Sequence, residues 1–204
     1  MQEIEAKFYV QDLGKIEARI QSLGARLIQP RVLETNIRFD LPDGGLRSEG
    51  RVLRLRQDTE ARLTYKGAGK GDQGIVNRTE IEFVVDDFEK AKDFLEALGY
   101  QRLLQYDKYR TTYILQTSEV SVHIMLDELP YGNFVEIEGE DSESIHAVAE
   151  KLHLHMNTAI TASYSMLFER VSKARGLTFT DLTFANFAGL NVTAKELSVH
   201  AADA

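Results

Sequence analysis

Polar and apolar side chains alternate strictly along much of this sequence, and that alternation is the period of a β-strand. The chain opens MQEIEAKFYV, in which Glu3, Glu5 and Lys7 stand two residues apart with apolar residues between them. The same pattern recurs in seven later segments. The sequence therefore predicts eight strands, at residues 2–9, 35–40, 51–57, 61–67, 77–85, 107–115, 120–128 and 133–139.

Four other segments place apolar residues three or four apart, which is the spacing of one helical face. They predict helices at residues 12–24, 86–99, 141–154 and 158–171. The first two segments end in Leu-Gly, and glycine is a common helix stop. The tripeptide Glu-Ile-Glu precedes each of the first three helices. This repetition indicates related strand–helix units within one domain.

Length, cysteine content and charge exclude several classes of protein. A chain of 204 residues suffices for one large all-β or α+β domain. The absence of cysteine excludes disulfides and thiolate metal sites. No apolar run reaches about 18 residues and no signal-peptide pattern is present, so we expect a cytoplasmic protein without a membrane partner. The net charge of −8 argues against broad binding to DNA, although a basic pocket can exist within an acidic protein.

Residues 67–74, GAGKGDQG, form a glycine-rich stretch between two predicted strands. In a P-loop, Ser or Thr follows the lysine, but here Gly71 follows Lys70 and a strand comes next. We therefore expect a mobile hairpin loop that can cover a site. His153 and His155 stand two residues apart, which is the wrong spacing to share a helical face, and we expect them at the surface rather than as metal ligands.

The polar faces of the predicted strands carry mostly Arg, Lys and Glu, where a random solvent face would also carry Ser, Gln and Asn. The charged residues are Glu3, Glu5, Lys7, Arg54, Arg56, Arg62, Lys66, Arg78, Glu80, Glu82, Lys108, Arg110, Asp127, Glu136 and Glu138. An antiparallel sheet with ion pairs on its solvent face explains any single strand. Eight strands can instead close into a barrel that holds a ligand, with helices over its apolar outer face. The predicted fold is therefore α+β, a closed eight-stranded antiparallel β-barrel with a charged tunnel and helices packed outside.

Charges inside such a tunnel need partners, because buried charges must be paired or must bind ions. Basic side chains on several walls suit an oligophosphate, since guanidinium groups match the geometry of phosphate oxygens. Glutamates two residues apart on facing strands offer oxygen ligands for hard cations such as Mg²⁺ or Mn²⁺. The basic and acidic residues of the tunnel therefore predict a site for a metal-bound polyphosphate.

In these motifs the chain resembles the CYTH domain, also called the triphosphate tunnel metalloenzyme superfamily. That family includes class IV adenylyl cyclases, thiamine triphosphatases, inorganic tripolyphosphatases and fungal-type RNA triphosphatases. Its signature E-x-E-x-K is similar to residues 3–7, EIEAK. The other matching residues are Arg54 and Arg56 in LRLR, Lys66 in LTYKG, Arg78, Glu80 and Glu82 in RTEIE, Lys108 and Arg110 in DKYR, Asp127 in LDELP, Glu136 and Glu138 in NFVEIEG, and Ser163 with Tyr164.

The resemblance spans residue 1 to about residue 170 and implies a CYTH triphosphate tunnel domain at residues 1–172. Residues 173–204 remain a C-terminal extension to which the motifs assign no role. We expect the phenylalanines of this extension to pack on the domain and its last few residues to be disordered.

The resemblance also implies roles for the individual residues. The substrate-binding residues would be Arg54, Arg56, Lys66, Arg78, Lys108 and Arg110. The metal ligands would be Glu3, Glu5, Glu136 and Glu138, with Glu80, Glu82 and Asp127 supporting a second ion or its water ligands. Glu3, Glu5 and Lys7 would form the catalytic group, in which Lys7 is either the proton acceptor or a further phosphate-binding residue.

Three functions are compatible with this site. The first is metal-dependent hydrolysis of inorganic tripolyphosphate, thiamine triphosphate or a nucleoside triphosphate. The second is a class IV adenylyl cyclase, which converts ATP to cyclic AMP and pyrophosphate in the same kind of tunnel. The third is a module that binds polyphosphates or nucleotides without catalysis. In each case the partner is a small-molecule triphosphate, with Mg²⁺ or Mn²⁺ as cofactor, and the protein is a monomer or a homodimer.

Overall fold

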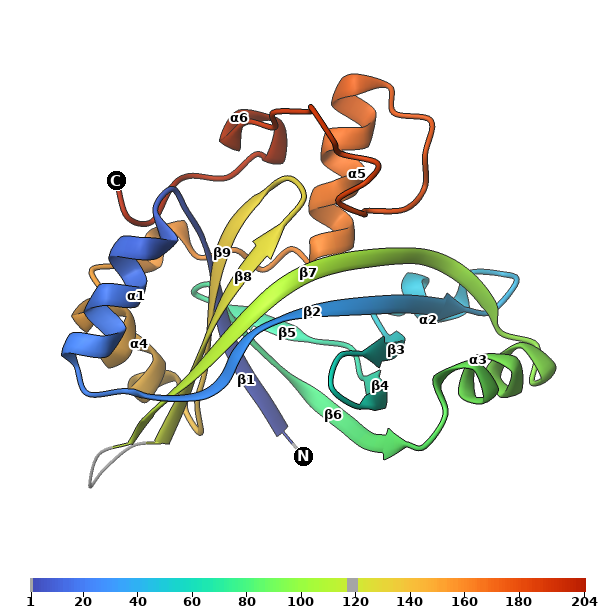
Figure 1. Ribbon diagram of the computed structural model, residues 1–204, viewed down its shortest axis with the longest axis horizontal. Coiled ribbons are helices and arrows are strands. Elements are labelled where there is room, and N and C mark those ends of the chain that lie inside the picture. Colours follow the sequence, from blue (N-terminus) through green and yellow to red (C-terminus); the bar gives the residue numbers. More distant parts are fainter. Residues whose placement is uncertain (1, 117–120) are drawn as a thin grey trace.

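Nine antiparallel strands form one sheet in the computed structural model, which describes residues 2–116 and 121–204 (Figure 1). The strands are β1 (Gln2–Val10), β2 (Arg26–Asp40), β3 (Val52–Gln57), β4 (Ala61–Lys66), β5 (Lys70–Asp72), β6 (Ile75–Val85), β7 (Gln101–Gln116), β8 (Ser121–Leu129) and β9 (Gly132–Glu138). The hydrogen-bonded order is β1-β9-β8-β7-β2-β3-β4-β6, and β6 pairs again with β1. That last pairing closes an eight-stranded barrel, as the sequence predicts, and the short β5 adds to β6.

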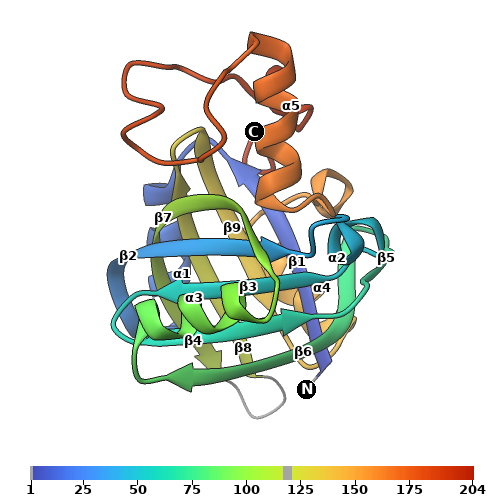
Figure 2. The same cartoon turned by 90° about the vertical axis from the view of Figure 1, so that its right-hand side faces the viewer.

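Helices pack on the outside of the barrel (Figures 1 and 2). They are α1 (Leu13–Ser22), α2 (Gly45–Ser48), α3 (Phe88–Ala97), α4 (Ser142–Lys151), α5 (Tyr164–Arg175) and α6 (Ala194–Leu197), with a 3-10 turn at Met156–Thr158. α1 and α4 share a core with β1, β8 and β9, whereas Leu95 of α3 packs on Leu53 and Leu55 of β3. Within the described ranges, no helix is long and apolar enough to cross a membrane.

The local sequence explains the ends of α1 and α3, both of which were predicted. Asp12 and Asp87 are the N-cap residues, and each side chain accepts a hydrogen bond from the backbone N–H three residues on. The chain leaves the two helices at Gly24 and Gly99, whose φ angles are 76° and 93°. Glycine is favoured in this left-handed region because it has no Cβ.

β2 and β7 are longer than the predicted strands. β2 begins nine residues earlier and β7 six residues earlier than the alternation suggests. The two strands pair with each other along their length, but the register shifts near Leu27, near Gln29 and at Arg38. Such irregularities interrupt the alternation of side chains, which is why the sequence pattern missed the first half of each strand.

The helix predicted at residues 158–171 starts later than expected, at Tyr164. Thr158 ends the 3-10 turn and the chain then runs extended at Ala159, next to which the Ile160 N–H donates a hydrogen bond of 2.7 Å to the Lys7 carbonyl on β1. The Ser163 side chain then caps the helix by accepting a backbone hydrogen bond from its first turn. The predicted start was wrong because apolar spacing alone does not reveal this contact with β1.

Residues 67–74 form the predicted hairpin connection, and part of it pairs with β6 as β5. Gly74 is required in this hairpin, since its φ is 85° and an added Cβ would lie 2.5 Å from Ala159. The predicted strand at 120–128 begins one residue outside the described range, and β8 starts at Ser121. His153 and His155 are exposed, as expected.

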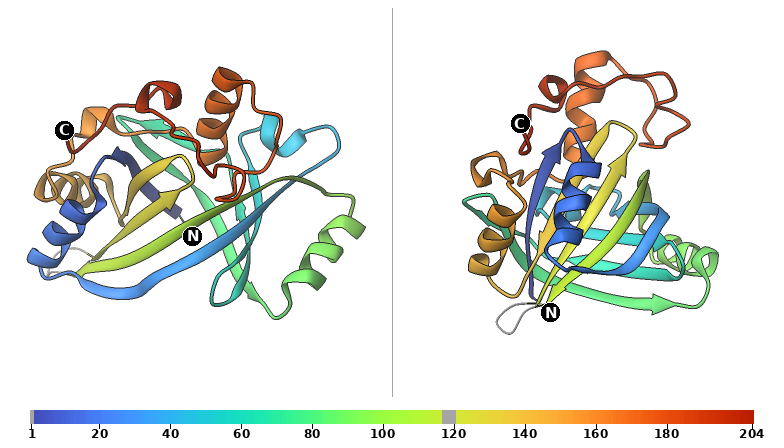
Figure 3. Two further views of the ribbon diagram at one scale, coloured as in Figure 1. Left: turned by 45° about the horizontal axis from the view of Figure 1, so that its top comes forward. Right: turned by 60° about the vertical axis from the view of Figure 1, so that its left-hand side comes forward.

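The C-terminal extension, residues 173–204, packs on the barrel and makes backbone hydrogen bonds to β7 and to β1. Leu182 exchanges backbone hydrogen bonds of 2.9 Å with Gln105 and Asp107 of β7. Further along, the extension passes over the β8–β9 hairpin and returns to β1, where the Ala202 N–H donates to the Tyr9 carbonyl at 2.9 Å (Figure 3).

The final residues of the extension are ordered, so the prediction of a disordered end was wrong. Ala202 is fully buried, and the Asp203 carboxylate accepts hydrogen bonds from the Gln11 and Asp12 backbone at 2.9 and 3.0 Å. The predicted packing of the phenylalanines is confirmed. The rings of Phe179 and Phe187 lie 6.1 and 5.9 Å from Phe168 of α5.

Candidate active site

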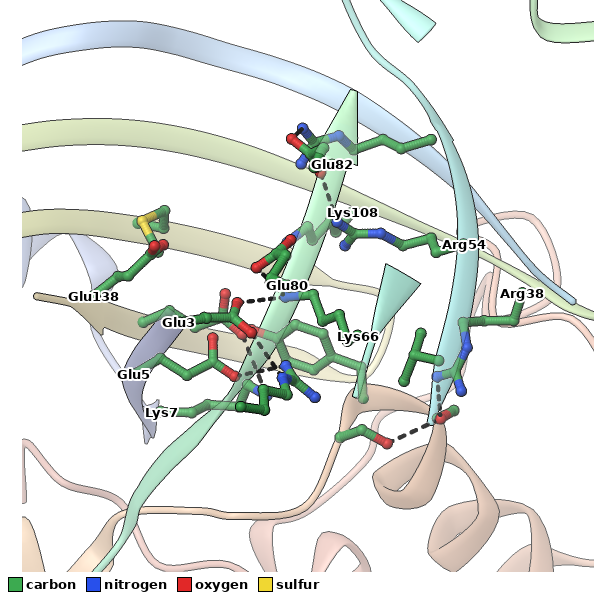
Figure 4. Close-up of a pocket in the computed structure, with 18 of the residues that line it drawn as sticks. Glu3, Glu5, Lys7, Arg38, Arg54, Lys66, Glu80, Glu82, Lys108 and Glu138 are labelled. Atoms are coloured by element: carbon green, nitrogen blue, oxygen red, sulfur yellow. Dashed lines mark hydrogen bonds and ion pairs between the residues drawn. The ribbon is translucent and has the colours of Figure 1, made fainter. Parts of the chain in front are cut away.

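A cavity of about 550 Å³ lies inside the barrel, and charged side chains form most of its wall (Figure 4). It is lined by Gln2, Glu3, Glu5, Lys7, Arg38, Val52, Arg54, Arg56, Lys66, Arg78, Glu80, Ile81, Glu82, Tyr106, Lys108, Arg110, Met125, Glu136, Glu138, Ser163, Tyr164 and Ser165. Thirteen of the fourteen predicted site residues are in this lining, and Asp127 is the exception. The charged strand faces therefore point into the barrel and not to solvent.

β1 supplies one wall of the cavity because it lies between β6 and β9. Glu3 stands opposite Arg78, whose guanidinium donates to Glu3 at 2.7 Å and to Glu5 at 3.1 Å. The Lys66 ammonium group also donates to Glu3. Burial alone would raise the pKa of Glu3, but the charges of Lys66 and Arg78 lower it to about 2.

Four carboxylates gather where β1 meets β9 and β6, and we call Glu3, Glu5, Glu80 and Glu138 the carboxylate cluster. Glu5 lies directly opposite Glu138 in the register, and opposite like charges repel. In the described part of the chain, the Glu138 carboxylate makes no hydrogen bond or ion pair. Burial, Glu3 and Glu5 together raise the pKa of Glu138 to about 7. Burial likewise raises the pKa of Glu80.

The carboxylate cluster fits a divalent cation by its chemistry. No three acidic or histidine side chains among residues 2–116 and 121–204 converge closely enough to enclose a metal ion. The cluster nevertheless consists of oxygen donors, which Mg²⁺ and Mn²⁺ prefer. The raised pKa of Glu138 reflects burial and the negative charges of Glu3 and Glu5, and a bound cation would offset both effects.

Lys7 lies next to the cluster on β1, opposite Glu136 of β9. Its ammonium nitrogen is 3.3 Å from the Glu136 carboxylate and 4.3 Å from the centre of the Tyr164 ring. Burial alone would lower the pKa of Lys7, but Glu136 and Glu5 raise it. Lys7 is therefore a charged group at neutral pH.

Asp127 lies behind the cavity wall, where it is fully buried. Its two oxygens accept hydrogen bonds from Lys108 at 2.9 Å, from the Arg110 Nε at 2.6 Å and from the Tyr164 hydroxyl at 2.8 Å. The Arg110 guanidinium also bonds to Glu136. Asp127 therefore fixes the orientation of three side chains that do line the cavity.

Arg54 and Arg56 project from β3 toward β6. Arg54 donates to the Thr64 hydroxyl at 3.2 Å and to Glu82 at 3.4 Å, and Arg56 donates to Glu82 at 3.3 Å. Burial alone would raise the pKa of Glu82, but Arg56, Thr64 and Arg54 lower it. Behind Arg56, the buried Glu34 carboxylate lies 3.7 Å away.

Sequence reasoning missed several residues of the site. Glu34 and Arg38 of β2 and Tyr106 of β7 point toward the interior, but none was assigned a role. Arg38 falls within the alternating segment TNIRFD, so the strand pattern offered a signal for it. Glu34 and Tyr106 each precede the predicted start of their strand by one residue.

Comparison with known proteins places this fold and site in context. The sequence model of the CYTH domain matches residues 1–164. The chain is 31% identical over 152 residues to a protein of Methanocaldococcus jannaschii that is provisionally named an adenylate cyclase. That match covers 74% of this chain and 82% of the archaeal protein.

Solved structures share the fold, among them two that resemble this chain over most of its length. One is a provisionally named adenylate cyclase from Vibrio parahaemolyticus, with a TM-score of 0.70 and 22% identity, covering 82% of this chain and 97% of that chain. The other is a Hippeastrum protein, provisionally named an adenylyl cyclase and described as having a dominant triphosphatase activity. It has a TM-score of 0.61 and 18% identity, and covers 82% of this chain and 95% of that chain.

Proposed function

The chain belongs to the CYTH domain family, and on this premise we propose that it hydrolyses a small triphosphate in a reaction that requires a divalent metal ion. The candidate substrates are inorganic tripolyphosphate, thiamine triphosphate and nucleoside triphosphates. The observation that carries the proposal is the convergence of eight basic side chains with the carboxylate cluster in one cavity. This combination suits a polyphosphate that binds together with a cation.

Six of the eight basic residues of the lining bind and orient the phosphate chain in this proposal. They are Arg54, Arg56, Lys66, Arg78, Lys108 and Arg110. Each lies within 4.0 Å of at least one carboxylate, so its charge is held in position before substrate enters. Phosphate oxygens can take over these contacts, and the same groups stabilise charge that develops on the phosphoryl oxygens.

Glu3, Glu5, Glu136 and Glu138 are the proposed metal ligands, with Glu80 and Glu82 available for a second ion. When bound, Mg²⁺ or Mn²⁺ would polarise a phosphoryl oxygen and lower the pKa of its water. We leave Asp127 out of the metal set, because it is fully buried behind the cavity wall, where Lys108, Arg110 and Tyr164 bond to its oxygens. The raised pKa of Lys7 supports a charged, phosphate-binding role for this residue rather than a proton-accepting one.

The alternative function is an adenylyl cyclase, which is favoured by the name of the archaeal relative. The lining argues for hydrolysis instead, since few of its described residues could hold a purine. Its two aromatic side chains are already engaged, Tyr164 with Lys7 and Tyr106 with Arg54. The dominant triphosphatase activity described for the Hippeastrum protein is a precedent for hydrolysis in this fold.

The proposal is tested by incubating the protein with Mg²⁺ or Mn²⁺ and, separately, tripolyphosphate, thiamine triphosphate and ATP. Release of orthophosphate that stops on addition of EDTA supports a triphosphatase. Formation of cyclic AMP and pyrophosphate from ATP identifies a cyclase. Binding of triphosphates without turnover identifies a binding module and contradicts both enzymes.

Glu138→Gln is the sharpest variant for this test, because Glu138 has no ion pair in the described chain that the substitution would break. We expect a loss of activity of about 100-fold or more, since a proposed metal ligand is removed. The melting temperature should stay the same or rise, because repulsion with Glu5 is relieved. Glu140→Gln, at an exposed position just beyond β9, is the matched control and should retain full activity.

A further inference from the structure

Arg38 differs from the other basic side chains of the cavity. Seven of the eight lie within 4.0 Å of a carboxylate. Arg38 on β2 has no such partner among the described residues. The nearby Asp40 forms no ion pair with it in the described chain, and the Asp40 oxygens accept backbone hydrogen bonds from Leu41 and from Leu46 and Arg47 of α2. Arg38 is therefore the basic side chain of the cavity that has no carboxylate within ion-pair distance among the described residues.

The surroundings of Arg38 offer hydroxyl groups but no anion. Its Nη1 donates to the Ser165 hydroxyl at 3.3 Å, and the Ser165 and Ser163 hydroxyls are 3.0 Å apart. Its Nε is buried and makes no hydrogen bond. A buried donor without an acceptor costs free energy, and a buried charge without a counter-charge costs more. An arrangement of this kind is stabilised by an anion that accepts from the guanidinium.

Burial and the positive charges around Arg38 act in the same direction on its protonation. Burial lowers its pKa, and Arg54 and Arg78 lower it further, while Tyr106 and Asp40 act in the opposite sense. Arg54 and Arg78 are cations rather than partners. Arg38 lies directly opposite Arg54 in the β2–β3 register, so the two arginines project from neighbouring positions of adjacent strands. A multiply charged anion can satisfy both.

The position of Arg38 defines which part of a ligand it could reach. In Figure 4, Arg38 and Glu138 lie on opposite sides of the cavity, with Lys66 and Arg54 between them. Arg38 is held where β2 meets the first turn of α5, and the carboxylate cluster is at β1, β6 and β9. A phosphate bound by Arg38 is therefore remote from the proposed metal ligands.

We propose that Arg38, with the hydroxyl groups of Ser163 and Ser165, binds the phosphate that lies furthest from the carboxylate cluster. This subsite makes the cavity selective for three linked phosphates over two, since a diphosphate held by the metal and the central cations does not extend to Arg38. The inference rests on the proposed function, because it takes a polyphosphate as the ligand. A purely structural role for Arg38, joining α5 to β2 through Ser165, is the competing explanation.

The experiment measures the affinity of the full-length protein for tripolyphosphate and for pyrophosphate by titration calorimetry, with Ca²⁺ in place of the catalytic metal. Arg38→Ala should weaken binding of tripolyphosphate by about 10- to 100-fold, the range for hydrogen bonds to a charged group. Binding of pyrophosphate should change by less than about 3-fold. Ser165→Ala should weaken tripolyphosphate binding by about 2- to 10-fold, because it removes a neutral hydrogen-bonding group.

Arg31→Ala is the matched control, since Arg31 is on the same strand but pairs outside the barrel with Glu128 at 2.7 Å. It should bind both ligands as the wild type does. The melting temperature distinguishes the subsite from the structural explanation. If Arg38 forms a subsite, Arg38→Ala should be as stable as the wild type or more stable. If Arg38 instead links α5 to β2, the melting temperature of Arg38→Ala should fall clearly. A destabilised Arg38→Ala that weakens both ligands equally overturns the subsite.

Two further outcomes separate this inference from the proposed function. If wild type binds tripolyphosphate and Arg38→Ala binds it equally well, the subsite is wrong and the proposed function stands. If wild type binds neither polyphosphate, the proposed function fails and the subsite fails with it.

Discussion

Glu34 shows how a single buried carboxylate organises the cavity from behind. It is 2% exposed, and its oxygens lie 3.4 Å from Lys108, 3.7 Å from Arg56 and 3.9 Å from Arg110. Burial alone would raise the pKa of Glu34, but Lys108, Arg110 and Arg56 lower it to about 2. One residue therefore compensates three of the cations that the proposed function uses to bind phosphate.

Glu34→Gln should lower the free energy of unfolding by about 3 kcal/mol at neutral pH, because it leaves buried cations with less compensation. Urea denaturation measures this change. Glu128→Gln is the control, since the same substitution there breaks a partly exposed ion pair with Arg31 and should cost less than about 1 kcal/mol. Equal losses in the two variants would contradict the role given to Glu34.

The stability difference between wild type and Glu34→Gln should depend on pH, because the pKa of Glu34 is lowered in the folded chain. The pKa of Glu34 is about 2 in the folded chain and 4.5 ordinarily, so the unfolded state binds more protons between these values. Its contribution to stability is fully present above about pH 5 and is lost as the pH falls toward about 2. The difference between wild type and Glu34→Gln should therefore shrink over this range. A difference that stays constant would show that the charge of Glu34 is not what stabilises the fold.

Much of the site was predictable from the alternation of polar and apolar residues, because a regular strand points every second side chain to the same face. The prediction reached Glu3, Glu5 and Lys7 for that reason. It missed Glu34 because the predicted strand began one residue later, at Thr35, although the register of β2 is regular from Val32 to Arg38. It also could not show that the oxygens of Asp127 are occupied by side chains from β7 and α5, since those contacts depend on how distant elements meet.

Among the elements, α5 links the extension to the cavity. Its first residue, Tyr164, reaches from the helix to Asp127 and covers Lys7. Phe168 of the same helix packs against Phe179 and Phe187 of the extension. The extension therefore supports the helix that supplies one wall of the cavity. The solved structures that share the fold match only about four-fifths of this chain, although they are themselves matched almost completely.

Phe187→Ala should destabilise the protein by about 3–5 kcal/mol, which is typical of removing a buried aromatic side chain. Phe187 is 4% exposed and contacts Tyr131 of the β8–β9 turn as well as α5. Chemical denaturation gives the change. Phe94→Ala removes the same side chain from α3, where it is 63% exposed, and should cost less than about 1 kcal/mol. If Phe187→Ala is as stable as Phe94→Ala, the extension does not support α5.

The elements differ in how far local sequence specifies them. α1 and α3 were predictable because their caps and their stops are both local, at Asp12 and Gly24 and at Asp87 and Gly99. The path of the extension was not, since its order depends on backbone hydrogen bonds to β7 and β1. A tail without regular structure gives no pattern that reveals such partners.

The whole molecule combines an acidic exterior with a basic interior. The chain carries a net charge of −8, yet the cavity is lined by eight basic and six acidic side chains. Closing the barrel separates the two environments, because it turns the charged face of each strand inward. The overall charge therefore gave no information about the cavity. Only the placement of charges along each strand provided it.

A ligand that fills such a cavity should stabilise the whole barrel. A ligand at 100 times its Kd adds about 2.7 kcal/mol to the folded state, and for a chain of this size each kcal/mol raises the melting temperature by about 2–4 °C. Tripolyphosphate with Ca²⁺ should therefore raise it by about 5–11 °C in a thermal melt. Orthophosphate reaches fewer walls and should raise it much less at matched ionic strength.

The same melts can separate the metal from the phosphate contribution. Glu138→Gln should lose the part of the shift that depends on Ca²⁺, because a proposed metal ligand is missing. It should keep the part that tripolyphosphate gives without Ca²⁺, since the basic walls are intact. The surface control Lys92→Ala, on α3, should shift as the wild type does. Equal shifts from tripolyphosphate and orthophosphate would mean that the ligand contacts isolated surface charges, because only a ligand that spans several strands at once gains from their convergence.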